Sequence, residues 1–187
     1  MGLDMYLTKK IYVGAEYSHR KVTGQCEIFI DGKKLPINFN QISYIEEKCG
    51  YWRKANQIHK WFVDNVQDGV DNCGDYSVSE EQLNQLLEVC LKVKKASKLV
   101  KGAVTNGYTL ENGVKIPNVE EGKEIKDSSV AEQLLPTASG FFFGGTDYDE
   151  YYMNDIDNTI EIINKILSEK EEGKNYLPFD VYYSSSW

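Results

Sequence analysis

Hydrophobic residues alternate with other side chains at the start of the chain. Leu3, Met5 and Leu7 stand two residues apart, and this spacing is typical of a strand with one buried face. The first dozen residues are therefore predicted to form a strand. Residues 181–187 at the other end, which include Val181 and two tyrosines, are predicted to form another.

A hairpin is predicted after the first strand. Residues 26–30 have the composition of a strand, and residues 34–39 are expected to return as its partner. The Asp31-Gly32 pair between them suits a tight turn, because glycine adopts the positive φ that such turns need. Asn40 then has the position of a helix N-cap, so a helix is predicted over residues 41–49.

The segment from residue 50 to residue 74 is the densest in aromatic, cationic and amide groups. Its hydrophobic residues follow spacings of four, three and four, which is one stripe of a helix: Tyr51, Ala55, Ile58 and Phe62. We therefore predict a helix over residues 51–66, separated by Gly50 from the helix before it. A polar loop is expected over residues 70–76.

Two further helices have clear patterns. Ser79 and Gln82 form a capping box, and hydrophobic residues at helical spacing continue to about residue 97. A later helix is expected to begin at Thr146 or Asp147 and to end at Gly173. Its buried stripe follows spacings of four, four, three and four: Tyr152, Ile156, Ile160, Ile163 and Leu167.

Residues 100–128 contain four glycines and little hydrophobic periodicity, so they are predicted to be a flexible insertion with a hairpin across residues 108–116. A short helical turn is expected over residues 129–134. Three consecutive phenylalanines at residues 141–143 predict a strand covered on both faces. We therefore expect a single α+β domain over residues 1–187, with an antiparallel sheet and about three main helices.

The net charge of −8 over 187 residues is unevenly distributed. Residues 1–110 carry fifteen basic and thirteen acidic side chains, whereas residues 111–172 carry fifteen acidic and only five basic ones. Such a charge repels nucleic-acid phosphates and favours basic partners. Direct nucleic-acid binding is therefore disfavoured, although the lysines from residue 92 to residue 101 keep a local basic patch open as an alternative.

The sequence lacks the signals of several other classes. No run of about eighteen apolar residues is present and the first residues do not resemble a secretion signal, so we expect a cytoplasmic protein without membrane contact. The four cysteines, at positions 26, 49, 73 and 90, form no CxxC pair. We expect them to be reduced, without zinc.

No complete catalytic, metal-binding or nucleotide-binding motif is present, so no cofactor and no metal are expected. The carboxylates after the Gly144-Gly145 turn have the oxygen ligands that a divalent cation prefers. Two of them, Asp149 and Asp155, fall on different faces of the expected helix, and acidic residues at a helix start are already favoured by its dipole. These carboxylates are Asp147, Asp149, Glu150, Asp155 and Asp157.

A second group of candidate residues lies on the edge of the helix predicted over residues 51–66. Arg53, Asn56 and His59 offer cationic, amide and imidazole groups. If they face the Gly144-Gly145 turn, they form a pocket for an anionic metabolite or signalling nucleotide. His59 has the chemistry of a general base only if a carboxylate pairs with it, and Asp68 and Asp71 are the nearest candidates in the sequence. A packing role is the alternative.

Four segments resemble a family of small proteins encoded by phages, prophages and other mobile elements. They are MGLDMYL at the start, YWRKANQIHKWFVDNVQDGVDNCGDY, LLPTASGFFFGGTDYDEYY, and YYSSSW at the end. The resemblance spans nearly the whole chain. It implies an accessory role in the cytosol of a bacterial host and carries no catalytic residues. Small acidic accessory proteins of phages include inhibitors of host defence, such as anti-CRISPR proteins.

The charge distribution and the resemblance together lead to one expected function. We expect a non-enzymatic protein that inhibits a basic, nucleic-acid-handling host defence protein, for which Cas9 is a candidate, through an acidic surface. The residues expected to contact this partner are Asp147, Asp149, Glu150, Asp157 and Glu161. The alternative is a small-molecule binding protein or enzyme with a pocket at Arg53, Asn56, His59 and the Gly144-Gly145 turn. The sequence leaves open whether the chain forms homo-oligomers.

Overall fold

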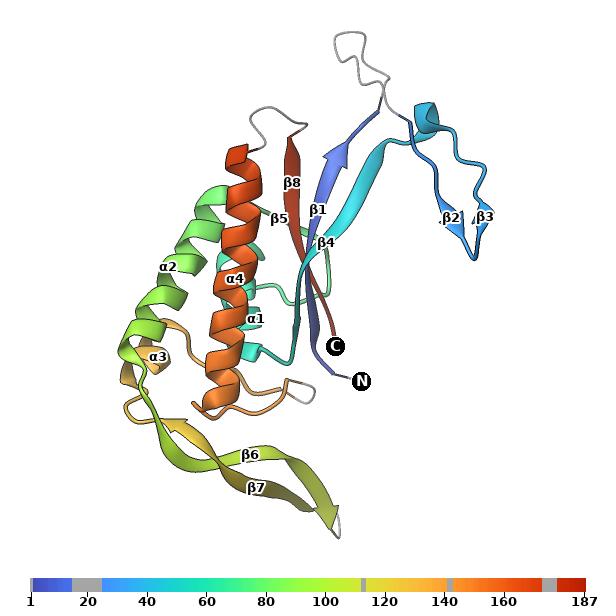
Figure 1. Ribbon diagram of the computed structural model, residues 1–187. Coiled ribbons are helices and arrows are strands. Elements are labelled where there is room, and N and C mark those ends of the chain that lie inside the picture. The colour runs from blue at the N-terminus through green and yellow to red at the C-terminus, as the bar shows by residue number, and fades with distance from the viewer. Residues whose placement is uncertain (1, 15–24, 112–113, 141–142, 173–177) are drawn as a thin grey trace.

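A computed structural model describes residues 2–14, 25–111, 114–140, 143–172 and 178–187 (Figure 1). Its main sheet has four antiparallel strands in the order β4-β1-β8-β5. They are β1 (Asp4–Tyr12), β4 (Tyr44–Arg53), β5 (Tyr76–Val78) and β8 (Phe179–Ser186). The two strands predicted at the ends of the chain are thus confirmed, and they lie side by side in the middle of the sheet.

Three long helices pack on one face of this sheet, as Figure 1 shows: α1 (Asn56–Val66), α2 (Glu80–Ala96) and α4 (Glu150–Glu172). A short helix, α3 (Ser129–Leu134), contacts α2. The sequence predicts α2, α3 and α4 correctly, and the capping box at Ser79 and Gln82 is formed. The fold is the expected α+β class, with an antiparallel sheet under a layer of helices.

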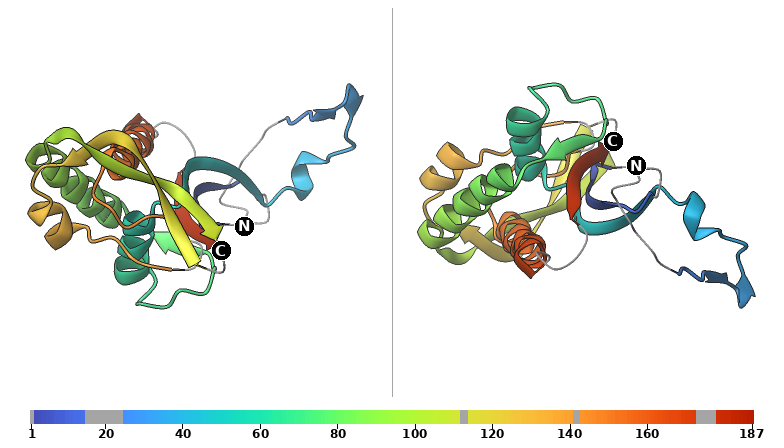
Figure 2. Two further views of the ribbon diagram at one scale, coloured as in Figure 1. Left: turned by 90° about the horizontal axis from the view of Figure 1, so that it is seen from below. Right: turned by 90° about the horizontal axis from the view of Figure 1, so that it is seen from above.

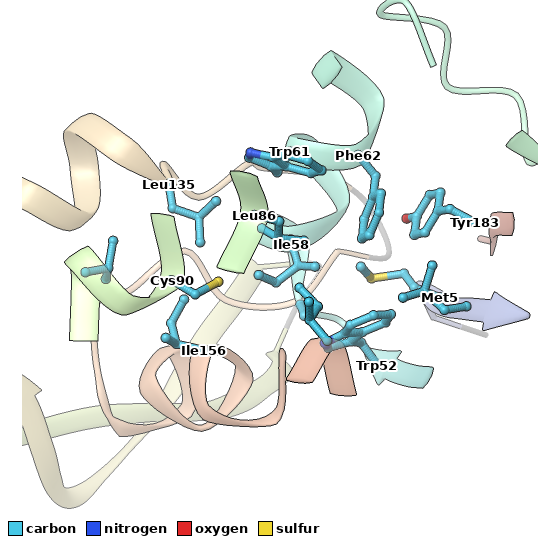
Figure 3. Close-up of a cluster of buried hydrophobic side chains, with 14 of the residues drawn as sticks. Met5, Trp52, Ile58, Trp61, Phe62, Leu86, Cys90, Leu135, Ile156 and Tyr183 are labelled. Carbon is cyan, nitrogen blue, oxygen red and sulfur yellow. The ribbon is translucent and has the colours of Figure 1, made fainter. Parts of the chain in front are cut away.

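The hydrophobic core lies between the sheet and the helices (Figure 3). Leu3, just before β1, and Met5 and Leu7 in β1 belong to this core and are fully buried, as their alternation predicts. The ring of Phe62 on α1 stacks on Tyr183 of β8, with centroids 4.0 Å apart. These contacts fix the start of the chain, its end and α1 against one another.

The helix predicted over residues 41–49 is wrong, because these residues belong largely to β4, which pairs with β1 along its length. Only a 3-10 helix, η1 (Phe39–Gln41), forms before it, and its N-cap is Asn38 instead of Asn40. Gly50 does not separate two helices. A Cβ atom added there would lie 2.8 Å from Cγ2 of Ile162, so glycine is needed for α4 to approach the sheet.

The helix predicted over residues 51–66 begins later than expected, at Asn56. Tyr51 lies in β4 with 47% of its surface exposed, and its hydroxyl donates to Asp4 Oδ1 at 2.6 Å. The other three members of the predicted stripe, Ala55, Ile58 and Phe62, are fully buried. Tyr51 therefore fits the helical spacing of the predicted stripe although it lies in a strand. Periodicity alone does not distinguish the two structures here.

Two antiparallel ribbons project from opposite ends of the molecule (Figures 1 and 2). The first is the predicted hairpin, β2 (Phe29–Ile30) and β3 (Lys33–Lys34), with positive φ at Asp31 and Gly32. It is separate from the main sheet. The second consists of β6 (Leu99–Glu111) and β7 (Val114–Ile125). It confirms the predicted hairpin and extends it over nearly the whole insertion, whose flexibility stays a prediction.

Phe143 lies in a loop and not in a strand, while the two phenylalanines before it and Gly173 lie outside the described residues. The N-cap of α4 is Asp149 instead of Thr146 or Asp147, since Asp149 Oδ1 accepts the amides of Tyr151 and Tyr152 at 2.9 and 3.0 Å. The four cysteines are free. Among the helices described, none is long and apolar enough to span a membrane.

Candidate ligand-binding cavity

A cavity of about 670 Å³ opens where α1 and α4 begin. Its walls come from the junction of β4 with α1, the first turns of α4, the described loop residues 137–140 and 143–147, and a β-bulge in β6 between Thr105 and Tyr108. A volume of about 300–1,000 Å³ is typical of pockets that bind small molecules. Side chains with charged or aromatic groups line it: Arg53, Lys54, Tyr108, Asp147, Tyr151 and Asp155.

Asn56 organises the loop that forms one wall. Its amide nitrogen donates to the carbonyl oxygens of Phe143 and Gly145 at 3.0 and 2.7 Å, and its Oδ1 accepts the amide of Ala138 at 2.8 Å. Only 1% of Asn56 is exposed. Because these bonds occupy the side chain, Asn56 holds the loop in place and does not offer its amide to a ligand.

Lys54 stands at the junction between β4 and α1 in a left-handed conformation, with φ of 63°. Its amide donates to Leu3 O at 2.8 Å, and its own carbonyl accepts the amide of Asn56 at 2.9 Å. The Gly144 turn packs against it so closely that an added Cβ at Gly144 would lie 3.0 Å from the Cβ of Lys54. Within the described part of the chain the Lys54 ammonium has no partner, so a cation is available to a ligand.

Asp155 and Gln57 line the same cavity and are hydrogen-bonded to each other. Gln57 Nε2 donates to Asp155 Oδ2 at 3.0 Å. Burial raises the pKa of the Asp155 carboxyl to about 6, the hydrogen bond from Gln57 lowers it in part, and the charge of Asp149 raises it further. Asp155 is thus an acid that changes its charge close to neutral pH.

Arg53 lines the same cavity but is engaged with the chain. Its Nη1 donates to both carboxylate oxygens of Asp4, at 2.8 and 3.1 Å. The hydrogen bond from Tyr51, together with Arg53, lowers the pKa of Asp4. Arg53 therefore contributes positive charge at the rim, partly neutralised by Asp4, while Lys54 supplies the unpaired cation.

His59 does not line this cavity. It lies on α1 with 1% of its surface exposed, beside a second cavity of about 290 Å³. Its Nδ1 accepts from the Tyr183 hydroxyl at 2.7 Å, and its Nε2 donates to Asp71 Oδ2 at 3.0 Å. Nε2 is assigned as the donor because an ionised carboxylate can only accept hydrogen bonds. Asp71 is one of the two carboxylates that the sequence analysis gives as possible partners of His59. Both ring nitrogens of His59 are occupied, however, so neither is available to a substrate.

The predicted pocket residues therefore divide into two groups. Arg53, Asn56 and the Gly144-Gly145 turn do lie around one cavity, whereas His59 belongs to a structural network. Sequence reasoning did not single out Lys54 and Gln57. A signal for Asp155 exists in the sequence, because it follows Tyr152 by three residues and precedes Thr159 by four, which places it on the buried face of α4.

The five acidic residues expected to contact a partner also have different environments. Asp149 is 6% exposed and caps α4, so the helix uses its carboxylate. Glu150 accepts the amide of Lys123 at 2.9 Å, and Asp157 pairs with Lys94 at 2.7 Å. Two are exposed and have no ion pair with any described residue: Asp147 at the cavity rim and Glu161 on α4.

Neither a metal centre nor a known relative defines the site further. Among the residues that the structure describes, no group of three or more His, Cys, Asp or Glu side chains is placed to hold a metal ion. No protein-family model, curated protein or solved structure matches this chain. The geometry of the cavity therefore carries the functional argument.

Proposed function

We propose that this protein binds a small molecule that carries an anionic group, up to about the size of a nucleotide, in the cavity between the starts of α1 and α4. The observation that carries this proposal is the pairing, in one cavity of about 670 Å³, of the unpartnered Lys54 ammonium with the Asp155–Gln57 pair. Such a cavity offers a few polar groups at fixed positions, which is the usual design of a small-molecule site.

The positions of these groups support binding without a large rearrangement. Gln57 and Asp155 are carried by helices, and the loop that lines the same cavity is held by the three hydrogen bonds of Asn56. A site whose walls are already ordered loses little conformational entropy when a ligand enters. The cation at Lys54 then attracts a phosphate or carboxylate group from solution.

Thermal unfolding with a panel of nucleotides, sugar phosphates and carboxylic acids tests this proposal. A ligand at about one hundred times its Kd stabilises the folded state by about 2.7 kcal/mol, which corresponds to a rise in Tm of about 5–10 °C for a domain of this size. Lys54→Ala is expected to weaken binding of the stabilising ligand at least about tenfold. Lys98→Ala, which removes an exposed lysine outside the cavity, is the matched control.

The proposal fails if no member of the panel shifts Tm and if isothermal titration calorimetry detects no binding. It also fails if the Lys98 and Lys54 variants lose equal affinity, because that result assigns binding to net charge and not to the cavity.

A second candidate function is inhibition of a basic, nucleic-acid-handling host protein, with Cas9 as one candidate, by a chain encoded by a phage or prophage and acting in the bacterial cytosol. The exposure of Glu161, on the same face of α4 as Glu150 and Asp157, favours it. Carboxylates on one helix face can compete with phosphates for a basic groove, with an affinity that falls as salt rises.

Pull-down of Cas9 and other host nucleases at low and high salt tests this second function. Glu161→Lys is expected to abolish salt-sensitive binding, whereas Glu88→Lys on α2 preserves it. Absence of binding to any basic nucleic-acid-handling protein at low salt excludes this function and leaves the first proposal unaffected.

A further inference from the structure

The hydrogen bond between Gln57 and Asp155 fixes which atoms this side of the cavity offers to a ligand. An ionised carboxylate only accepts hydrogen bonds, so Gln57 must turn its NH₂ group toward Asp155. Its Oε1 atom is then directed away from that bond. In the described residues, neither Asp155 Oδ1 nor Gln57 Oε1 accepts a hydrogen bond, although both side chains line the cavity.

We propose that the Asp155–Gln57 pair recognises two adjacent N–H donors at one end of the ligand, while Lys54 holds an anionic group at the other end. This inference rests on the proposed small-molecule function and narrows its ligand class. The chemistry is that of the guanine edge, which presents N1–H beside the N2 amino group, or of a guanidinium. The first occurs in guanine nucleotides and the second in arginine, whose carboxylate supplies the anion.

An acceptor pair discriminates strongly between such ligands and close analogues. Two adjacent N–H donors that meet Asp155 Oδ1 and Gln57 Oε1 form a two-point contact, charge-assisted at the carboxylate, worth about 1–3 kcal/mol of discrimination in comparable base recognition, or about 5- to 150-fold in affinity. An analogue with one donor missing leaves a buried acceptor unpaired, and one with a carbonyl there places two acceptors in contact.

Aromatic side chains of the cavity suit a planar group next to these acceptors. Tyr151 is 44% exposed, and its hydroxyl is held by Glu120 Oε1 at 3.1 Å, so the ring is anchored at its polar end. Tyr108 follows the bulge of β6, where Gly107 has φ of 79°. Bulges of this kind redirect side chains next to binding sites. Both purine bases and guanidinium groups stack on tyrosine rings.

The charge of Asp155 at neutral pH is compatible with this role. Burial and the charge of Asp149 raise its pKa to about 6, although the hydrogen bond from Gln57 lowers it in part, so the carboxylate is mostly ionised at pH 7.5. The other charged groups that line the cavity are Asp147 and Asp149 before α4, and Arg53 and Lys54 at the junction of β4 with α1.

The test is isothermal titration calorimetry at pH 7.5 with matched ligand pairs on the unmodified chain. GMP is compared with IMP, which lacks only the N2 amino group, and arginine with citrulline, in which a carbonyl oxygen replaces one NH₂ group and the guanidinium charge is absent. We expect GMP or arginine to bind at least about tenfold more tightly than its analogue. The pair that shows the difference identifies the source of the two donors.

A substitution at Asp155 is expected to change which ligand is preferred, and a purely structural role of this residue would not produce that change. Asp155→Asn replaces an acceptor by a donor, so GMP is expected to lose at least about tenfold in affinity while XMP, which has a carbonyl at C2, gains relative to it. Asp157→Asn, two residues further on the exposed side of α4, is the control and leaves both affinities unchanged. Unfolding curves confirm that both variants are folded.

Equal binding of GMP and IMP, and of arginine and citrulline, overturns this inference, and so does absence of binding by all four. If Lys54-dependent binding of another anion is found at the same time, the proposed function stands and only the ligand class is wrong.

Discussion

The two cavities are lined by similar residue types but differ in how far the chain itself uses them. Around the smaller cavity, His59 gives both ring nitrogens to Tyr183 and Asp71, and Asp71 accepts a further bond from Trp187 Nε1 at 3.0 Å. Around the larger one, Lys54 has no partner among described residues and Asp155 retains an acceptor. Spare hydrogen-bonding capacity, and not residue type, distinguishes a candidate site from a structural network.

The first consequence of this difference is that His59 matters most for stability. His59→Ala leaves the Tyr183 hydroxyl without this partner, removes one of the two hydrogen bonds to the Asp71 carboxylate, and opens a cavity in the core. We expect a loss of about 3–5 kcal/mol in the free energy of unfolding. Tyr183→Phe removes only one bond and is expected to cost about 1–2 kcal/mol. Urea denaturation measures both, and a loss below about 1 kcal/mol for His59→Ala contradicts the structural assignment.

Replacement of Asp155 is expected to raise stability, in contrast to replacement of His59, because burial of the Asp155 carboxyl favours its protonated form. Its folded pKa of about 6 lies above the ordinary value of 3.8, so the folded state binds the proton more tightly between about pH 4 and pH 6. Stability therefore falls as pH rises through this window. Asp155→Asn removes the effect, and at pH 7.5 it is expected to be more stable than the unmodified chain by about 2–3 kcal/mol.

The measurement is urea denaturation of both chains at pH 4 and at pH 7.5. The difference between them should be small at pH 4, where both side chains are largely uncharged. A constant difference across this range means that Asp155 does not titrate in the folded protein near pH 6.

Lys54 is expected to cost stability through its backbone while it serves a ligand through its side chain. A non-glycine residue in the left-handed region costs about 1–2 kcal/mol of stability. Glycine removes this cost, but part of the gain is lost because glycine raises the conformational entropy of the unfolded chain. Lys54→Gly should therefore stabilise the fold by about 0.5–1 kcal/mol and weaken ligand binding. Lys48→Gly, in the extended backbone of β4, should instead destabilise it by about 1 kcal/mol. Thermal unfolding separates these signs.

The smallest effect is expected for the ion pair between Asp157 and Lys94 on the helix surface. Both side chains are about half exposed, at 51% and 52%, and exposed pairs of this kind contribute about 0–1 kcal/mol. A double-mutant cycle of Asp157→Ala and Lys94→Ala should give a coupling energy below about 0.5 kcal/mol. A larger value shows that Asp157 serves the fold and is not free for a partner.

Helices with uninterrupted patterns could be predicted from the sequence. The capping box at Ser79 and the stripe from Tyr152 to Leu167 depend on residues close in the chain, so the local pattern contains the whole signal. The strand β4 could not be predicted in the same way. Its partner, β1, lies about forty residues away, and its polar middle has no strand alternation of its own.

The candidate site was predicted in part. Arg53, Asn56 and the Gly144-Gly145 turn were expected together and lie around one cavity. The chemistry within that cavity was not foreseen, because it depends on the tertiary structure: Lys54 lines the cavity from a left-handed residue where β4 meets α1, and burial raises the pKa of Asp155. The role of Asn56 as a fastener of the loop likewise depends on carbonyl groups more than eighty residues away.

The sequence by itself determined the α+β class, three of the helices, the two terminal strands and the sign of the charge, since each follows from local periodicity or from a count of residues. The tertiary structure decided which polar side chains are used up and which remain available. The sequence favours His59 as a site residue over Asp155, but hydrogen bonds across the fold satisfy both nitrogens of His59 and leave an acceptor of Asp155 open. That distinction depends on distances between distant segments, which no local pattern encodes.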